Sequence, residues 1–190
     1  MEQLFAMLLG IYPMSEGLIE YLKRTLETIE LQAKDYLLRK GQVSDRIYFV
    51  ERGIVRGYDK DERGKQTTLW FMDEGNVIVA VKSFFGRKAS TEVIQALEYS
   101  VLHGITYDQL YYAYENFLEF NYHGRELTTK YYQSSAERTE MLQRMKALER
   151  YEFTKATQPG ILKRESVTDN DLSSYLGITP EHLSRIKKNY

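Results

Sequence analysis

The segment 167–188, VTDNDLSSYLGITPEHLSRIKK, constrains this chain more than any other part of its sequence. The spacing of apolar residues in its first half predicts a helix over 169–176. Gly177 follows, and glycine is the residue that most often ends a helix in a left-handed conformation. The segment therefore begins with a short helix that stops at a sharp corner. The inner face of this helix consists of Leu172, Tyr175 and Leu176.

A second helix is predicted directly after that corner. Thr179 offers a side-chain oxygen as N-cap, and Pro180 suits the first helical position because its missing N–H has no partner there. Leu183 and Ile186 would form the inner face and leave a polar, basic outer face. This is the helix-turn-helix layout, in which the second helix enters the DNA major groove. Two amphipathic helices around a glycine also occur in domains that never bind DNA, so the spacing alone leaves both interpretations open.

The outer face of the second helix supplies the candidate DNA contacts. Arg185 can donate to O6 and N7 of guanine, and Glu181 can accept from N4 of cytosine. Ser184 can bond a phosphate, whereas Lys187 and Lys188 are better placed for backbone contacts. The candidate DNA-binding residues are Thr179, Pro180, Glu181, His182, Ser184, Arg185, Lys187 and Lys188.

Composition excludes several classes of function. The 190 residues include no cysteine, which removes disulfides, thiolate catalysis and cysteine-ligated zinc or iron–sulfur clusters. His103 is the only histidine in the strand-rich part, too few for a cupin-type metal site, and no Ser-His-Asp, Walker or dinucleotide signature occurs. No apolar run approaches the roughly 18 residues of a membrane span, and the N-terminus lacks the basic start of a signal peptide. We therefore expect a cytoplasmic protein that is not an enzyme, holds no metal or cofactor and does not contact a membrane.

Short strands are predicted for the first part of the chain. The turns between them contain glycine, as at Gly53 and Gly64. Many short strands of this kind indicate a sandwich or roll of antiparallel sheets, against which a helical leader over 16–31 should pack. The predicted strands are 47–50, 54–58, 67–72, 77–81, 92–97 and 101–106.

A long helix is predicted for 107–142, which contains no proline. Five residues on it are spaced 4, 3, 4 and 3 apart, as in the seam of a coiled-coil pair. A helix packed on its own domain would explain the same stripe, so both interpretations stay open. The candidate seam consists of Leu127, Tyr131, Ser134, Arg138 and Met141.

Three stretches together resemble the Crp/Fnr regulator family. The C-terminal segment is similar to its helix-turn-helix of the form LxxxLGIxxExLSRIxKK. The run YLLRKGQVSDRIYFVERGIVRGY (36–58) resembles the start of its cyclic-nucleotide-binding roll, and the order ALExSxLxxI (96–105) resembles the strands that close the roll. The resemblance implies an α+β fold with an N-terminal antiparallel β jelly-roll sensor domain over 1–116. A long dimerisation helix over 117–143 and a helix-turn-helix domain over 144–190 would follow.

The resemblance also implies a function. It implies a homodimeric transcription regulator that binds double-stranded DNA in a sequence-specific manner, with the long helix pairing with its twin across a two-fold axis. The five seam residues would then be the dimer interface. A second hypothesis is a small-molecule-binding module whose helix-turn-helix serves as a packing or protein-interaction surface. Binding that weakens with salt would favour the first hypothesis.

The family's nucleotide cassette is matched poorly here. It resembles GExA…RxA, in which a Glu accepts the ribose hydroxyl and an Arg pairs with the cyclic phosphate. Val79 and Ala80 occupy the Gly-Glu positions, and the Arg position falls at Ala89 or Ser90. We therefore expect a roll that does not bind cyclic AMP in the usual way, with an unidentified small-molecule effector or none. The candidate ligand contacts are Val79, Ala80, Lys82, Arg87, Lys88 and Ser90, of which the three basic ones could equally be solvated loop charges.

Overall fold

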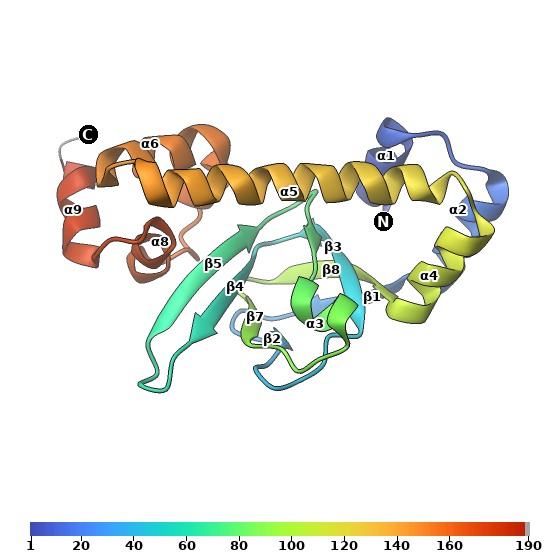
Figure 1. The fold of residues 1–190 in the computed structure, drawn as a ribbon, viewed down its shortest axis with the longest axis horizontal. Coiled ribbons are helices and arrows are strands. Elements are labelled where there is room, and N and C mark those ends of the chain that lie inside the picture. The colour runs from blue at the N-terminus through green and yellow to red at the C-terminus, as the bar shows by residue number, and fades with distance from the viewer. Residues whose placement is uncertain (189–190) are drawn as a thin grey trace.

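The computed structural model describes residues 1–188 and shows a β-roll joined by a long helix to a helical C-terminal domain (Figure 1). The strands are β1 (Glu27–Leu31), β2 (Tyr36–Leu38), β3 (Arg46–Arg52), β4 (Val55–Lys60), β5 (Gln66–Met72), β6 (Val77–Ile78), β7 (Glu92–Ala96) and β8 (Ser100–Thr106). The helices are α1 (Glu2–Ile11), α2 (Glu16–Thr25), α3 (Val81–Gly86), α4 (Tyr107–Asn116), α5 (Phe120–Arg144), α6 (Ala147–Thr157), α7 (Pro159–Lys163), α8 (Asp169–Leu176) and α9 (Pro180–Lys188).

The roll consists of two antiparallel sheets that face each other. One has the strand order β1-β8-β3-β6 and the other β2-β7-β4-β5. Apolar residues from both sheets fill the space between them, because successive side chains of a strand point to opposite faces. The predicted α+β architecture of a jelly roll, a long helix and a helix-turn-helix is confirmed. The buried residues of this core are Leu38, Val50, Val55, Ile78, Ala80, Ile94 and Leu102.

Two glycines of the roll are required by close approaches. Gly53, between β3 and β4, has a φ of +93°, a conformation that side chains rarely adopt. A Cβ on Gly53 would also lie 2.6 Å from the carbonyl oxygen of Tyr99. A Cβ on Gly57 of β4 would lie 2.1 Å from the indole of Trp70 on β5, so this glycine leaves room for the Trp70 side chain.

Three predicted elements differ in extent from those observed. The predicted strand 77–81 is short, because the chain leaves β6 after Ile78 and turns into α3. The predicted leader helix ends at Thr25, and the residues after it form β1, which pairs with β8. The predicted helix 107–142 divides into α4 and α5. Asn121 stabilises that break, since its side-chain amide donates to the carbonyl oxygen of Tyr114 at 2.9 Å.

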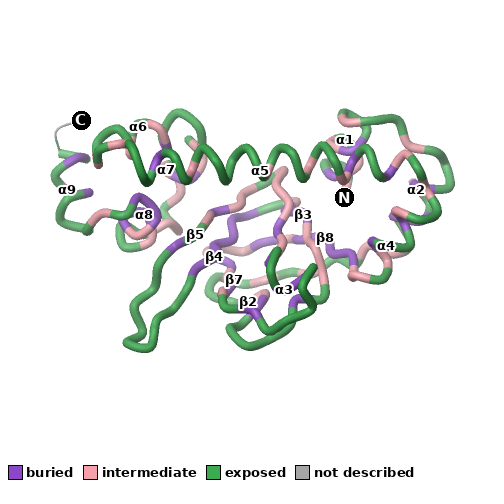
Figure 2. Tube along the Cα trace, viewed as in Figure 1, coloured by how far each residue is buried: buried purple, intermediate pink, exposed green. Residues whose placement is uncertain are grey.

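The start of α5 is held by the N-terminal helices. His123 is fully buried, and its Nε2 lies 3.1 Å from the carbonyl oxygens of both Leu8 and Tyr12. His103 is buried in β8, where its Nδ1 lies 2.9 Å from the hydroxyl of Thr28. Both histidines thus have structural partners. From this anchored end, α5 runs past the roll to the C-terminal domain, and most of its length is exposed (Figures 1 and 2).

Within residues 1–188, none of the helices combines the length and the apolar character that crossing a bilayer requires.

Candidate nucleic-acid interface

The helix-turn-helix forms as its local sequence predicts. Thr168 caps α8, because its hydroxyl oxygen accepts from the backbone N–H of Asp171 at 3.2 Å. Gly177 ends α8 with a φ of +65°. Thr179 then accepts from the backbone N–H of His182 at 3.3 Å, directly before Pro180 opens α9. The corner between the two helices is therefore built by the capping residues that the sequence displays.

Helix α9 presents a polar face to solvent. Leu183 and Ile186, which are 0% and 7% exposed, bury its inner face. Ser184 is half-buried at the edge of that face. The remaining predicted DNA contacts are all exposed: Thr179, Pro180, Glu181, His182, Arg185, Lys187 and Lys188.

Charges on and beside α9 are partly paired. Hydrogen bonds from its own backbone N–H and from Thr179, with the nearby charge of Arg185, lower the pKa of the Glu181 carboxyl. Glu181 therefore stays ionised as a hydrogen-bond acceptor at neutral pH. Lys187 forms an ion pair with Asp169 at the start of α8, so this lysine bridges the two helices.

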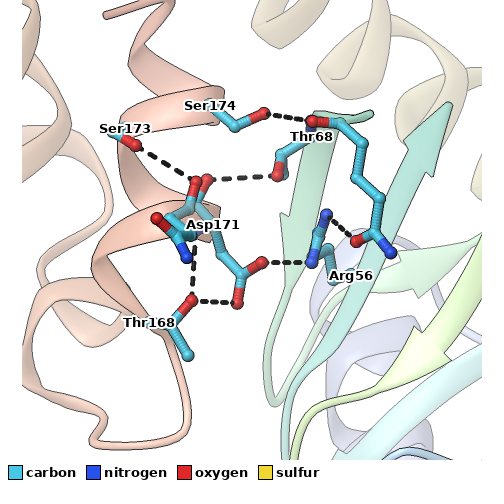
Figure 3. Close-up of polar contacts among 8 residues, drawn as sticks. Arg56, Thr68, Thr168, Asp171, Ser173 and Ser174 are labelled. Carbon is cyan, nitrogen blue, oxygen red and sulfur yellow. Dashed lines mark hydrogen bonds and ion pairs between the residues drawn. The ribbon is translucent and has the colours of Figure 1, made fainter. Parts of the chain in front are cut away.

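Helix α8 of the C-terminal domain packs against strands β4 and β5 of the roll. We call this contact the roll–helix interface (Figure 3). It consists of Ile54, Arg56, Thr68 and Phe71 from the roll with Asp171, Ser174 and Tyr175 from α8.

An ion pair and three hydrogen bonds between the roll and α8 form the polar part of this interface, and in one of them the hydroxyl of Ser174 donates to the carbonyl oxygen of Gln66 at 3.2 Å. Arg56, only 4% exposed, pairs with the carboxylate of Asp171. Burial lowers the pKa of Arg56, and the charge of Asp171 opposes that shift. The N–H of Thr68 donates to the hydroxyl of Ser174 at 2.8 Å, and the hydroxyl of Thr68 donates to the carbonyl oxygen of Asp171 at 3.1 Å. These contacts join strands β4 and β5 to helix α8.

The apolar part of the roll–helix interface is continuous with the core of the C-terminal domain. Ile54 and Phe71 are buried in one cluster with Leu172 and Leu176 of α8. The rings of Phe71 and Tyr175 lie with their centroids 5.3 Å apart. Separating α8 from the roll would expose these side chains to water, which is costly in proportion to their apolar area.

Two arginines tie this domain to α5. Arg138 donates to the carbonyl oxygens of Leu69 and Tyr175, each at 2.9 Å, and its guanidinium lies 3.7 Å from the centre of the Tyr175 ring. Burial lowers the pKa of Arg138. Arg150 of α6 donates to the carbonyl oxygens of Leu142 and Leu176, at 2.9 and 3.0 Å. These arginines cap the ends of α5 and α8.

Three of the five predicted seam residues form hydrogen bonds or are buried within the single chain. The hydroxyl of Tyr131 accepts from the N–H of Val77 at 2.6 Å. Arg138 binds the carbonyls described above, and Met141 is 1% exposed. Leu127 is half-buried, and Ser134 alone is exposed. The stripe therefore packs largely on its own domains, which is the alternative that the sequence left open.

Only two of the six predicted ligand contacts line the cavity inside the roll. Val79 and Ala80 line a cavity of about 20 Å³ inside the roll, together with apolar residues such as Leu38 and Ile94. Arg46, which the sequence did not single out, lines it as well but is paired with Glu27. Pockets for small molecules usually have about 300–1,000 Å³, so this one has room for little more than a water molecule.

The other ligand candidates lie outside that cavity lining. Arg87 donates to the carbonyl oxygen of Ser44 at 3.1 Å and covers the ring of Tyr107. Ser90 is buried, but its hydroxyl donates to the carbonyl oxygen of Glu92 at 2.9 Å. Lys82 and Lys88 are exposed. In residues 1–188, no cluster of three or more His, Asp or Glu side chains is arranged to hold a metal ion.

Comparisons with known proteins agree with this architecture. Residues 28–117 match the cyclic nucleotide-binding domain family. FixK2 from Bradyrhizobium japonicum has a similar structure, with a TM-score of 0.75 at 16% identity over 87% of this chain and 84% of that one. A protein described as a transcriptional regulator of the Crp/Fnr family from Eubacterium rectale has a TM-score of 0.72 at 15% identity, over 95% and 87%.

The c-di-GMP-responsive global regulator CLP of Xanthomonas campestris has a TM-score of 0.68 at 15% identity, over 92% of this chain and 91% of that one. No curated protein sequence matches this chain. At such identities the structural likeness concerns the fold alone. Residues 28–117 are thus similar to the cyclic nucleotide-binding domain family, and the fold of the chain is similar over most of its length to that of a Crp/Fnr family regulator.

Proposed function

We propose that this chain is a dimeric, sequence-specific DNA-binding transcription regulator of the Crp/Fnr type. The observation that carries the proposal is the outer face of α9. Glu181 and Arg185 are exposed one helical turn apart, on a helix whose other face is anchored by Leu183 and Ile186. A carboxylate and a guanidinium in that arrangement suit cytosine and guanine edges in the major groove.

The competing hypothesis gives the helix-turn-helix a packing role. Helix α8 does pack on the roll, through Asp171 and Ser174. Helix α9 lies beyond α8 at the end of the molecule (Figure 1), and its last turn carries three basic residues, all of them exposed. A surface used only for packing has no need of an exposed, basic second helix. Packing by α8 together with an exposed, basic α9 therefore supports DNA binding.

A second copy would pair along a different stripe of α5 from the one the sequence indicated. The stripe displaced by one residue has the same 4, 3, 4, 3 spacing, and its five residues are all exposed, from 36% at Leu142 to 76% at Tyr132 among the large apolar ones. Its small side chains would let two helices approach closely around Tyr132. A two-fold axis along this stripe would place two copies of α9 on one side of the dimer. The proposed seam consists of Thr128, Tyr132, Ser135, Thr139 and Leu142.

Selection of bound fragments from the organism's own genomic DNA tests the proposal. We expect a few fragments with a two-fold symmetric sequence to be enriched. Their binding should weaken steeply as salt rises, because each phosphate contact releases counterions. No enrichment over random fragments, or binding that salt does not change, would instead favour the packing hypothesis.

We further infer that the roll does not bind cyclic AMP in the usual way. The Gly-Glu positions hold Val79 and Ala80, and the cavity beside them has about 20 Å³. A ligand at 100 times its Kd raises the free energy of unfolding by about 2.7 kcal/mol, which is several degrees in melting temperature. We therefore expect no rise in melting temperature with millimolar cyclic AMP. A clear rise would show that the roll binds cyclic AMP and would overturn this inference.

A further inference from the structure

The helix-turn-helix of this chain does not complete its core alone. Ile54 and Phe71 of the roll are buried in the same cluster as Leu172, Leu176 and Leu183. Domains that share a large apolar interface move little relative to each other, whereas polar interfaces allow motion. The apolar contact holds α8 near the roll, but apolar packing is not directional. Hydrogen bonds and ion pairs depend on direction, so the polar contacts across this interface can fix the angle at which α8 lies.

Two ion-paired groups also join the two domains. In one, Arg56 of β4 pairs with Asp171 of α8. In the other, Arg164, which follows α7, pairs with both Glu74 and Glu98 of the roll. Each domain thus contributes an arginine to a carboxylate of the other. Of the two groups, the Arg56–Asp171 pair is the more buried, with side chains 5% and 12% exposed.

A second contact holds the carboxylate of Asp171 in one orientation. This carboxylate also accepts from the hydroxyl of Thr168, the N-cap of α8, at 2.8 Å. On the other partner, Gln66 holds the guanidinium of Arg56 through a 2.8 Å hydrogen bond. The pair therefore joins a fixed point of β4 to the first turn of α8. Because α9 follows α8 through the capped corner at Gly177, the direction of α8 decides the direction of α9.

We propose that Arg56 is a positioning residue for DNA recognition: through Asp171 it fixes the orientation of α9 and thereby the spacing of half-sites that the dimer accepts. This inference rests on the proposed function. Half-sites on one face of DNA lie about 34–36 Å apart, so a dimer with fixed recognition helices accepts one spacing. The docked arrangement leaves the outer face of α9 exposed, so docking and DNA binding are compatible.

The test compares half-site spacings in DNA with two variants of the full chain. Arg56→Met/Asp171→Leu replaces the buried pair by apolar side chains, which buried pairs often tolerate without loss of stability. Arg46→Met/Glu27→Leu makes the same exchange in an ion pair between β3 and β1 of the roll, whose side chains are 25% and 56% exposed, and is the control. The DNA is the symmetric fragment selected with the wild-type protein, with its half-sites moved by one or two base pairs in either direction.

Moving a half-site by two base pairs rotates it by about 70° and shifts it by about 7 Å. The wild-type protein and the control variant should lose affinity by about 100-fold or more, since only one half-site is then engaged. The Arg56→Met/Asp171→Leu variant should lose less than about tenfold, and should bind a single half-site as the wild-type protein does. Equal spacing profiles for all three proteins would overturn the positioning role alone. A wild-type protein that binds no DNA would overturn the proposed function and this assignment with it.

A reversible crosslink gives a second test that does not depend on removing charges. The chain has no cysteine, so Thr68→Cys/Ser174→Cys would carry its only thiols. These positions face each other across the roll–helix interface, where the N–H of Thr68 meets the hydroxyl of Ser174. The oxidised form should keep the affinity and the sharp spacing profile of the reduced form. Loss of binding on oxidation, restored by dithiothreitol, would show that α8 must leave the roll and would overturn the proposal. The two single-cysteine variants control for the substitutions.

Discussion

Arg185→Ala should weaken binding of the dimer to its symmetric site by about 2–6 kcal/mol, because each of two half-sites loses about 1–3 kcal/mol. That is a fall in affinity of roughly 30-fold to 10⁴-fold. The physical reason is that the guanidinium of Arg185 can donate two parallel hydrogen bonds to guanine, and alanine leaves both acceptors unpaired. Arg185 is exposed on α9, so the variant should fold normally. Titration of the selected fragment at fixed salt measures the loss.

The matched control is Lys188→Ala, which removes a positive charge from the same exposed helix. This variant should bind specific and random DNA more weakly by the same factor and reduce the salt slope by about 1 per copy. Arg185→Ala should in addition relax the preference at one base position of each half-site. If both variants lost the same affinity on specific and random DNA alike, the assignment of Arg185 to base reading would be wrong.

The helix-turn-helix could be predicted from the sequence because its signals are local. A capping threonine, a glycine corner and a proline at the first helical position each act within a few residues. Gly177 and Thr179 adopt the conformations that their residue types favour. The antiparallel roll was expected from the many short strands and from the resemblance of 36–58 and 96–105 to a known family, but the order of its strands was not predicted, since pairing between distant strands leaves no local signal.

The roll–helix interface could not be predicted, because its two sides are more than 100 residues apart. One signal was present: Arg56 interrupts the apolar run 54–58, and a charge in the middle of a strand requires a partner. Nothing in the sequence says that this partner is Asp171. Packing between distant parts of the chain also explains why most of the predicted seam is buried within the chain. The stripe through Tyr131 and Met141 is amphipathic, but the roll and the C-terminal domain supply the surface that it buries.

The exposed stripe of α5 leads to the second large prediction, Tyr132→Glu. Successive residues of a helix are about 100° apart, so a shift of one residue separates the buried stripe from the exposed one. Tyr132 is 76% exposed in the single chain, so its replacement should change the stability of the monomer little. In a dimer about the proposed seam, two glutamates would face each other across the two-fold axis, where like charges repel and apolar contact is lost.

We therefore expect Tyr132→Glu to sediment as a monomer at concentrations where the wild-type protein is a dimer. Its affinity for the symmetric site should fall by about 10²–10⁴-fold, because the second half-site is no longer held at a high effective concentration. Gln133→Glu adds the same charge to the neighbouring exposed position, about 100° around the helix, and should remain dimeric. Leu127→Glu decides between the two stripes: if that variant were monomeric and Tyr132→Glu dimeric, the two copies would pair through the stripe that the sequence indicated. The outer stripe would then have to face solvent, and α5 would have to leave the roll before two chains could meet.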